Sequence, residues 1–124
     1  MKRVTGIGGI FFKARDPEAL RAWYSRHLGI DVQDWGGAVL LWKDDRGGDG
    51  MTVWTIFPET TKYLEPSTQP FMINYRVENL PAVLDALRAE GCTVDDRTES
   101  SEFGHFGWVM DPEGNRIELW QPPS

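Results

Sequence analysis

The chain has 124 residues, 40% of them hydrophobic, with a formal net charge of −6 and a pI near 4.8. This length fits one domain with its own core, and the acidic balance argues against nucleic acid or a membrane surface as partner. A single cysteine, Cys92, excludes an internal disulfide and a zinc cluster. We therefore expect a cytoplasmic protein with no targeting or membrane-spanning segment.

The first half of the chain predicts a βαβββ unit. Residues Ile7–Lys13 form a β-branched and aromatic run that predicts a strand. Asp16 is suited to cap a helix whose apolar stripe ends before Gly29. Three further strands are predicted, at Asp31–Trp35, Ala38–Lys43 and Met51–Phe57. Residues Thr60–Gln69 then form a linker-like stretch.

The second half repeats this pattern. A strand is predicted at Phe71–Val77, a helix runs from an Asn79 cap to Gly91, and a short strand and a hairpin follow. The two caps lie 63 residues apart (79 − 16) and the two closing glycines 62 apart (91 − 29), close to half of the chain. We infer an internal duplication, with modules at about 1–60 and 70–124. Two such units should place their helices outside curved sheets and leave a concave inner surface.

The closing hairpin carries the most informative carboxylate. Asp111, Pro112 and Gly114 predict its turn, and Glu118 lies in the middle of the second strand. Arg116 and Trp120 share the face of Glu118, because side chains alternate along a strand. A carboxylate there is costly unless it meets water, a cation or a hydrogen-bond donor. Periodicity alone favours a solvated sheet face, and the alternative is a wet cleft.

Several motifs connect the chain with a known group of proteins. They are Asp16-Pro17, Trp23-Tyr24, His27–Gly29, Val77–Leu80, Leu87–Gly91 and Asp111–Leu119. With these motifs, which span nearly its whole length, the chain resembles the vicinal oxygen chelate superfamily, which includes glyoxalase I, bleomycin-resistance proteins and extradiol dioxygenases. The resemblance implies an α+β fold of two βαβββ modules forming an open barrel, and often a homodimer. In the enzymatic members it implies a divalent metal in each cleft.

The resemblance also implies where metal ligands should lie: on the first, fourth, fifth and last strands. Glu118 matches the last position. The first falls on Gly9 and the fifth on Met72, each seven residues before a helix cap, and the fourth falls near Trp54, with Thr52 on the same face. Glycine offers no ligand, and a thioether is a poor ligand for the ions concerned. We therefore expect the usual metal site to be missing and no cofactor to be bound.

The first functional hypothesis is a non-metal member similar to the bleomycin-resistance branch, which binds a small organic molecule in an aromatic groove. Glu118 would be the anionic anchor, and the acidic net charge would favour a cationic ligand. The groove residues expected from strand parity are Phe11, Thr52, Trp54, Met72, Asn74 and Trp120.

The alternative hypothesis is a metal-dependent enzyme, a lactoylglutathione lyase-like protein, isomerase or dioxygenase. It would use Glu118 together with His105, in one subunit or across a homodimer, to hold a divalent metal or move a proton. A histidine at the start of a strand more often makes a local hydrogen bond. A third hypothesis is a dimerisation module without a ligand.

Overall fold

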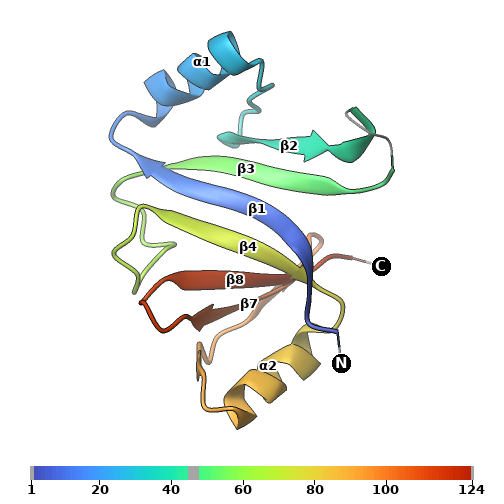
Figure 1. Cartoon of the computed structure of the whole chain (residues 1–124). Helices are drawn as coiled ribbons and strands as arrows, with labels where there is room; N and C mark the ends of the chain where they lie inside the picture. The colour runs from blue at the N-terminus through green and yellow to red at the C-terminus, as the bar shows by residue number, and fades with distance from the viewer. Residues whose placement is uncertain (1, 45–47, 124) are drawn as a thin grey trace.

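The computed structural model describes residues 2–44 and 48–123, which form one curled mixed sheet with two helices on its outside (Figure 1). The strand order is β2-β3-β1-β4-β8-β7-β5, with β6 paired to β7. The elements are β1 (Val4–Ala14), α1 (Pro17–Leu28), β2 (Gly37–Leu41), a 3-10 turn η1 (Trp42–Asp44), β3 (Met51–Pro58), β4 (Phe71–Val77), α2 (Leu80–Ala89), β5 (Thr93–Val94), β6 (Glu99–Ser101), β7 (Gly104–Met110) and β8 (Arg116–Gln121). In the part of the chain that the structure describes, no helix has the length and hydropathy needed to cross a membrane.

The two halves have matching topology. In the first half β1 pairs with β3 in parallel, and β3 pairs with β2 antiparallel. In the second half β4 pairs with β8 in parallel, and β8 pairs with β7 antiparallel. The antiparallel pair β1–β4 joins the halves at the centre of the sheet. The predicted fold class, two related modules forming an open barrel, is confirmed.

The helix boundaries follow from the capping residues. Asp16 accepts a hydrogen bond from the Ala19 backbone N–H at 3.1 Å, and Asn79 does the same for Ala82 at 3.1 Å. Gly29 ends α1 in the left-handed region, at φ +69°, which glycine adopts without steric cost. The caps thus place equivalent helices after the first strand of each module.

The predicted strand at Asp31–Trp35 is wrong. The Val32 N–H donates to the Ile30 carbonyl at 3.0 Å, and the Gly36 N–H donates to the Gln33 carbonyl at 3.0 Å. Because local turns use these backbone groups, the segment does not extend the sheet. The predicted strand Ala38–Lys43 also ends early, at Leu41, where η1 begins.

The two faces of the sheet carry separate apolar clusters. On the outer face α1 packs near Ala38, Trp54 and Ile56, and α2 packs on Val77, Val109 and Leu119. The inner-face cluster is formed by Phe11, Leu64, Met72 and Trp108. Leu64 comes from the segment between β3 and β4, residues 59–70, which we call the inner loop. The concave side of the sheet is therefore partly filled by the chain itself.

Candidate functional site

The strand register places one row of residues side by side across the inner face. Val53 pairs with Gly9, Gly9 with Asn74, Asn74 with Glu118, and Glu118 with Trp108. Residues paired between neighbouring strands project from the same face of a sheet. Glu118 thus lies within a row that both modules build.

Glu118 is buried, with 1% of its surface exposed, and each of its oxygens has a donor. The Asn74 side-chain N–H donates to Oε1 at 2.6 Å, and the Trp108 indole N–H donates to Oε2 at 2.9 Å. The Tyr63 hydroxyl also donates to Oε2. The expectation that Glu118 lies on a solvated face is therefore wrong, because three neutral donors take the place of water.

Burial raises the pKa of the Glu118 carboxyl above its ordinary value, since removal from water disfavours the charged form. The hydrogen bonds from Tyr63, Asn74 and Trp108, and the charge of Arg116, act in the opposite direction. Burial and the neighbouring Glu118 charge raise the pKa of Tyr63 far above its ordinary value. The phenol therefore stays a hydrogen-bond donor throughout the physiological pH range.

The inner loop holds Tyr63 over Glu118. The Tyr63 ring stacks on Phe57 with centroids 5.6 Å apart and meets the edge of Trp108 at 6.3 Å. The Arg116 guanidinium donates to the Tyr63 carbonyl and lies 4.7 Å from the centre of the Trp108 ring. Arg116 is itself buried and forms an ion pair with Asp95 at 3.5 Å. Phe57, Arg116 and Trp108 therefore form the walls around the Tyr63 ring.

Four of the six predicted groove residues share the inner face with Glu118. Phe11 and Met72 belong to the inner-face cluster, and Asn74 bonds to Glu118 directly. Trp120 stacks on Phe106 with centroids 6.2 Å apart, and its indole N–H donates to the Phe103 carbonyl at 2.7 Å. The structure brings these four residues together with Glu118 on the inner face, where all four are buried from solvent.

The expected placement of Thr52 and Trp54 is wrong. Trp54 packs against Phe12 and Tyr24 on the outer face, with ring centroids 5.8 and 5.1 Å away, and Thr52 has the same strand parity. The inner-face position of β3 in the central row is Val53. Sequence reasoning also missed Tyr63 and Trp108, although Trp108 could have been found as the residue opposite Glu118 in the predicted hairpin.

His105 does not join Glu118. It precedes Phe106, which stacks on inner-face Trp120, so His105 points to the opposite side of β7. Its ring Nδ1 lies 2.8 Å from the Ser100 hydroxyl, and its side chain is exposed. The predicted pairing of His105 with Glu118 within one chain is therefore wrong, and the local hydrogen bond accounts for the histidine.

The inner face does not supply a fitting donor set for the divalent ion that the resemblance implies. Gly9 on β1 and Val53 on β3, at the row positions beside Glu118, offer no ligating side chain. On β4, Met72 offers only a thioether and Asn74 a single amide oxygen, which is too few donors for a divalent ion. Both Glu118 oxygens already accept bonds from neutral donors. Across residues 2–44 and 48–123, no three His, Cys, Asp or Glu side chains are grouped as a metal would require.

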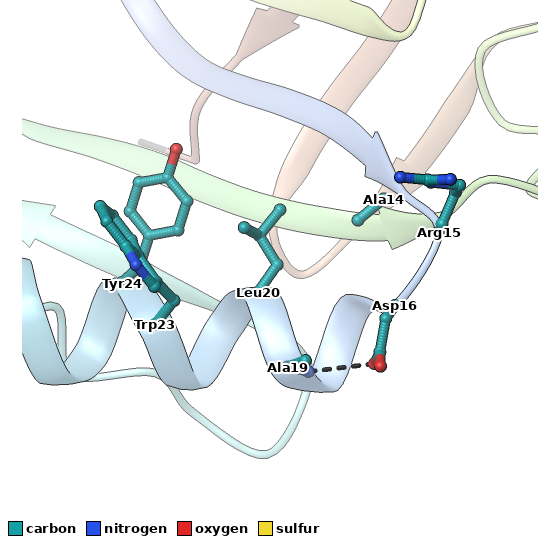
Figure 2. A pocket seen from close by; sticks show the side chains of 7 residues that line it. All are labelled: Ala14, Arg15, Asp16, Ala19, Leu20, Trp23 and Tyr24. Atoms are coloured by element: carbon teal, nitrogen blue, oxygen red, sulfur yellow. Dashed lines mark hydrogen bonds between the residues drawn. The ribbon is translucent and has the colours of Figure 1, made fainter.

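A surface hollow lies away from this row, beside α1 (Figure 2). It is open, holds about 770 Å³, and is lined by Ala14, Arg15, Asp16, Ala19, Leu20, Trp23 and Tyr24. Asp16 is used there to cap the helix. None of its lining side chains is a buried polar group, so the candidate site remains the inner-face row around Glu118.

Comparisons with known proteins place the chain in a family. A family model described as a glyoxalase-like domain matches residues 9–120. No curated protein sequence matches the chain.

Among solved structures, methylmalonyl-CoA epimerase from Mycobacterium tuberculosis is similar at 20% identity and a TM-score of 0.65, over 100% of this chain and 92% of that one. A glyoxalase/bleomycin resistance protein/dioxygenase superfamily member from Vibrio splendidus 12B01 is similar at 13% identity and a TM-score of 0.57, over 93% and 97%. The 2,3-dioxygenase LapB from Pseudomonas sp. KL28 is similar at 19% identity and a TM-score of 0.60, over 100% and 43%. These similarities concern the fold. With the family model matching most of its length, the chain belongs to the glyoxalase-like domain family.

Proposed function

We propose that the chain binds a small organic molecule on its inner face, around Glu118, without a divalent metal. Aromatic and apolar walls with a few convergent polar groups are typical of small-molecule sites. The walls here are Phe11, Met72 and Trp108, and the polar groups are Glu118 and Asn74. The carboxyl is the anchor, because it is the one acidic side chain of the central row.

The observation that carries this proposal is the occupancy of the site by Tyr63. A buried carboxyl that already accepts a phenol, and that aromatic rings enclose, has the chemistry of a ligand anchor. The Oδ1 atom of buried Asn74 has no hydrogen-bond partner among the described residues, so a second acceptor beside Glu118 awaits a donor. Binding requires the inner loop to withdraw Tyr63 and Leu64.

The test is calorimetric titration of the protein purified without chelator, first with Ni²⁺ or Zn²⁺ and then with a diverse set of small organic compounds. We expect saturable binding of at least one compound, lost in Glu118→Leu, and no stoichiometric binding of either metal ion. The matched control is Glu113→Gln, an exposed carboxyl in the same hairpin. One metal ion per chain, lost on the Glu118 substitution, would contradict the proposal.

A second candidate is proton transfer by Glu118 to a bound substrate, as in an isomerase. The observation favouring it is the buried carboxyl, which lies within hydrogen-bond distance of a phenol and whose pKa burial raises above its ordinary value, as is common for groups that give and take a proton. His105 has no part in this version, because it lies on the other side of β7. Exchange of a bound ligand's acidic C–H in D₂O, abolished in Glu118→Gln, would distinguish turnover from binding alone.

We also propose that the chain forms a homodimer through the outer face between the helices. Ile10, Ile7 and Phe71 are each more than 40% exposed. They pair with Ile73, Tyr75 and Phe12 across β1 and β4, which makes a continuous apolar strip. An exposed apolar strip of this kind is unusual on a monomer. The same strip on a second copy of the chain could bury it in a symmetric interface. Analytical ultracentrifugation should show a dimer that Ile10→Lys converts to monomer, and a monomeric unmodified chain would overturn this part.

A further inference from the structure

Three neighbouring side chains hold the aromatic ring of Tyr63 by contacts that the ring of a separate molecule could also make. Phe57 stacks on one face at an interplanar angle of 28°, and the Trp108 ring stands at 89° to it. The Arg116 guanidinium lies 5.9 Å from the ring centre. The Tyr63 hydroxyl donates to Glu118. The surrounding residues therefore contact both the aromatic ring and the hydroxyl group of Tyr63.

Between its ends, the inner loop makes few hydrogen bonds to the sheet. Its turns close on themselves: the Glu65 N–H donates to the Lys62 carbonyl at 3.1 Å and the Ser67 N–H to the Leu64 carbonyl at 3.0 Å. Within residues 61–69, the side-chain hydrogen bonds to the sheet are the two at Tyr63, one from Arg116 and one to Glu118. A ligand that replaced the Tyr63 ring would therefore compete with these two hydrogen bonds and with the apolar packing of Tyr63 and Leu64.

We propose that Tyr63 is the chain's own stand-in for the ligand, and that the site takes aromatic molecules carrying a hydroxyl or amino hydrogen-bond donor in its place. This inference rests on the proposed function and names the ligand class. The donor requirement follows from Glu118, whose Oε2 would lose the Tyr63 bond and be left with Trp108 alone.

The same geometry rejects two related classes. An aromatic ether fits the walls but leaves Glu118 without its second donor at Oε2, because it brings only an acceptor. An aromatic carboxylate places a second acid against the buried Glu118 carboxyl. A phenol or an aromatic amine avoids both problems.

The experiment titrates the unmodified chain, Tyr63→Phe and Tyr63→Ala with p-cresol, 4-methylanisole and p-toluate, using calorimetry. We expect p-cresol to bind Tyr63→Ala about tenfold or more tightly than the unmodified chain, since removing the internal competitor frees the site. Tyr63→Phe should lie between them, because its ring still competes but no longer bonds to Glu118. In Tyr63→Ala, 4-methylanisole should bind about tenfold or more weakly than p-cresol, and p-toluate weaker still.

Two controls keep the outcomes separate. Tyr75→Phe, on the outer face, should leave p-cresol binding unchanged. Tyr63→Ala with Glu118→Leu should lose the preference for p-cresol over 4-methylanisole. Equal binding of p-cresol and 4-methylanisole, or a preference for p-toluate, would overturn the ligand class while leaving a binding site in place. If circular dichroism shows that a Tyr63 variant is folded and none of the three compounds binds to either variant, the ligand class and the proposed function are both overturned.

Discussion

The hydroxyl of Tyr63 donates to the carboxyl of Glu118, a residue 55 positions later in the chain. Tyr63 comes from the connection between the two modules, and Glu118 comes from the last strand of the second. This bond ties the inner loop to the row of residues that both modules build. It closes the face of the sheet where a ligand would be expected.

The first prediction concerns this bond. Tyr63→Phe should lower the free energy of unfolding by about 1–3 kcal/mol, because a buried acceptor loses a donor. Urea denaturation measures the change. The control Tyr75→Phe removes a hydroxyl from the outer face, where no hydrogen bond to it occurs among the described residues. An equal loss in both variants would contradict the role given to the Tyr63 hydroxyl.

The second prediction concerns pH. Because burial raises the pKa of Glu118 in the folded protein, its contribution to stability is fully present below the ordinary pKa of 4.5 and is lost as pH rises through the folded-state pKa. The free energy of unfolding of the unmodified chain minus that of Glu118→Gln should therefore fall with rising pH. Its slope should reach at most about 1.4 kcal/mol per pH unit.

Urea denaturation at a series of pH values from about 4 to 8 checks this slope. The corresponding difference for Glu113→Gln should change much less, since that carboxyl is exposed. A difference for Glu118→Gln that rises with pH would mean that the hydrogen-bond donors outweigh burial and lower the pKa of Glu118.

The third prediction concerns Gly8. A Cβ at this position would collide with the Asn74 side chain and approach the Trp120 ring to 2.8 Å. Gly8→Ala should cost about 1–3 kcal/mol of unfolding free energy, because Asn74 must move away from Glu118. At Gly107 the nearest atoms to an added Cβ are side-chain methyl groups of Leu84 and Leu80, the closest at 3.0 Å, so Gly107→Ala should cost less. The reverse order, measured by thermal or urea denaturation, would rule out this packing.

The fourth prediction concerns Arg116, which fastens the inner loop through the Tyr63 carbonyl. Arg116→Met should open the loop and speed tryptic cleavage after the exposed residue Lys62 several-fold, because local opening exposes the peptide bond. Arg3→Met serves as the control, since the Arg3 guanidinium bonds to Glu90, after α2, and to no residue of the inner loop. Equal cleavage rates at Lys62 in all three proteins would show that Arg116 does not hold the loop.

Much of the fold follows from local sequence signals. Asp16 and Asn79 cap equivalent helices, and the repeat spacing between them predicts the duplicated topology that the strand pairing shows. The turn of the closing hairpin was also predictable, because Asp111 accepts bonds from the Glu113 and Asn115 backbone N–H groups at 2.9 Å. These features depend on residues close together in the chain.

The face of β3 could not be predicted in the same way. Val53 and Trp54 are both apolar, so the period of two does not tell which side meets α1 and which meets the inner face. The choice depends on the register between β1 and β3, which are joined by a helix and a long connection. Trp54 consequently lies against Tyr24 on the outer face.

The position of the Tyr63 ring over Glu118 could not be predicted for a related reason. Tyr63 lies in a stretch whose Thr and Pro content indicates a linker, and nothing local indicates that its ring enters the sheet. Burial of Glu118 depends on this long-range contact. Strand periodicity alone therefore suggested a solvated carboxylate.

The most direct test of the account follows the indole N–H signal of Trp108 by ¹H–¹⁵N NMR, because this group donates to Glu118 at 2.9 Å. The account predicts that p-cresol shifts this signal saturably, that Zn²⁺ leaves it in place, and that the Trp54 signal on the outer face stays unchanged throughout. A stoichiometric shift of the Trp108 signal with Zn²⁺, and none with p-cresol, would contradict the claim that an organic donor, and not a metal ion, is what Glu118 binds.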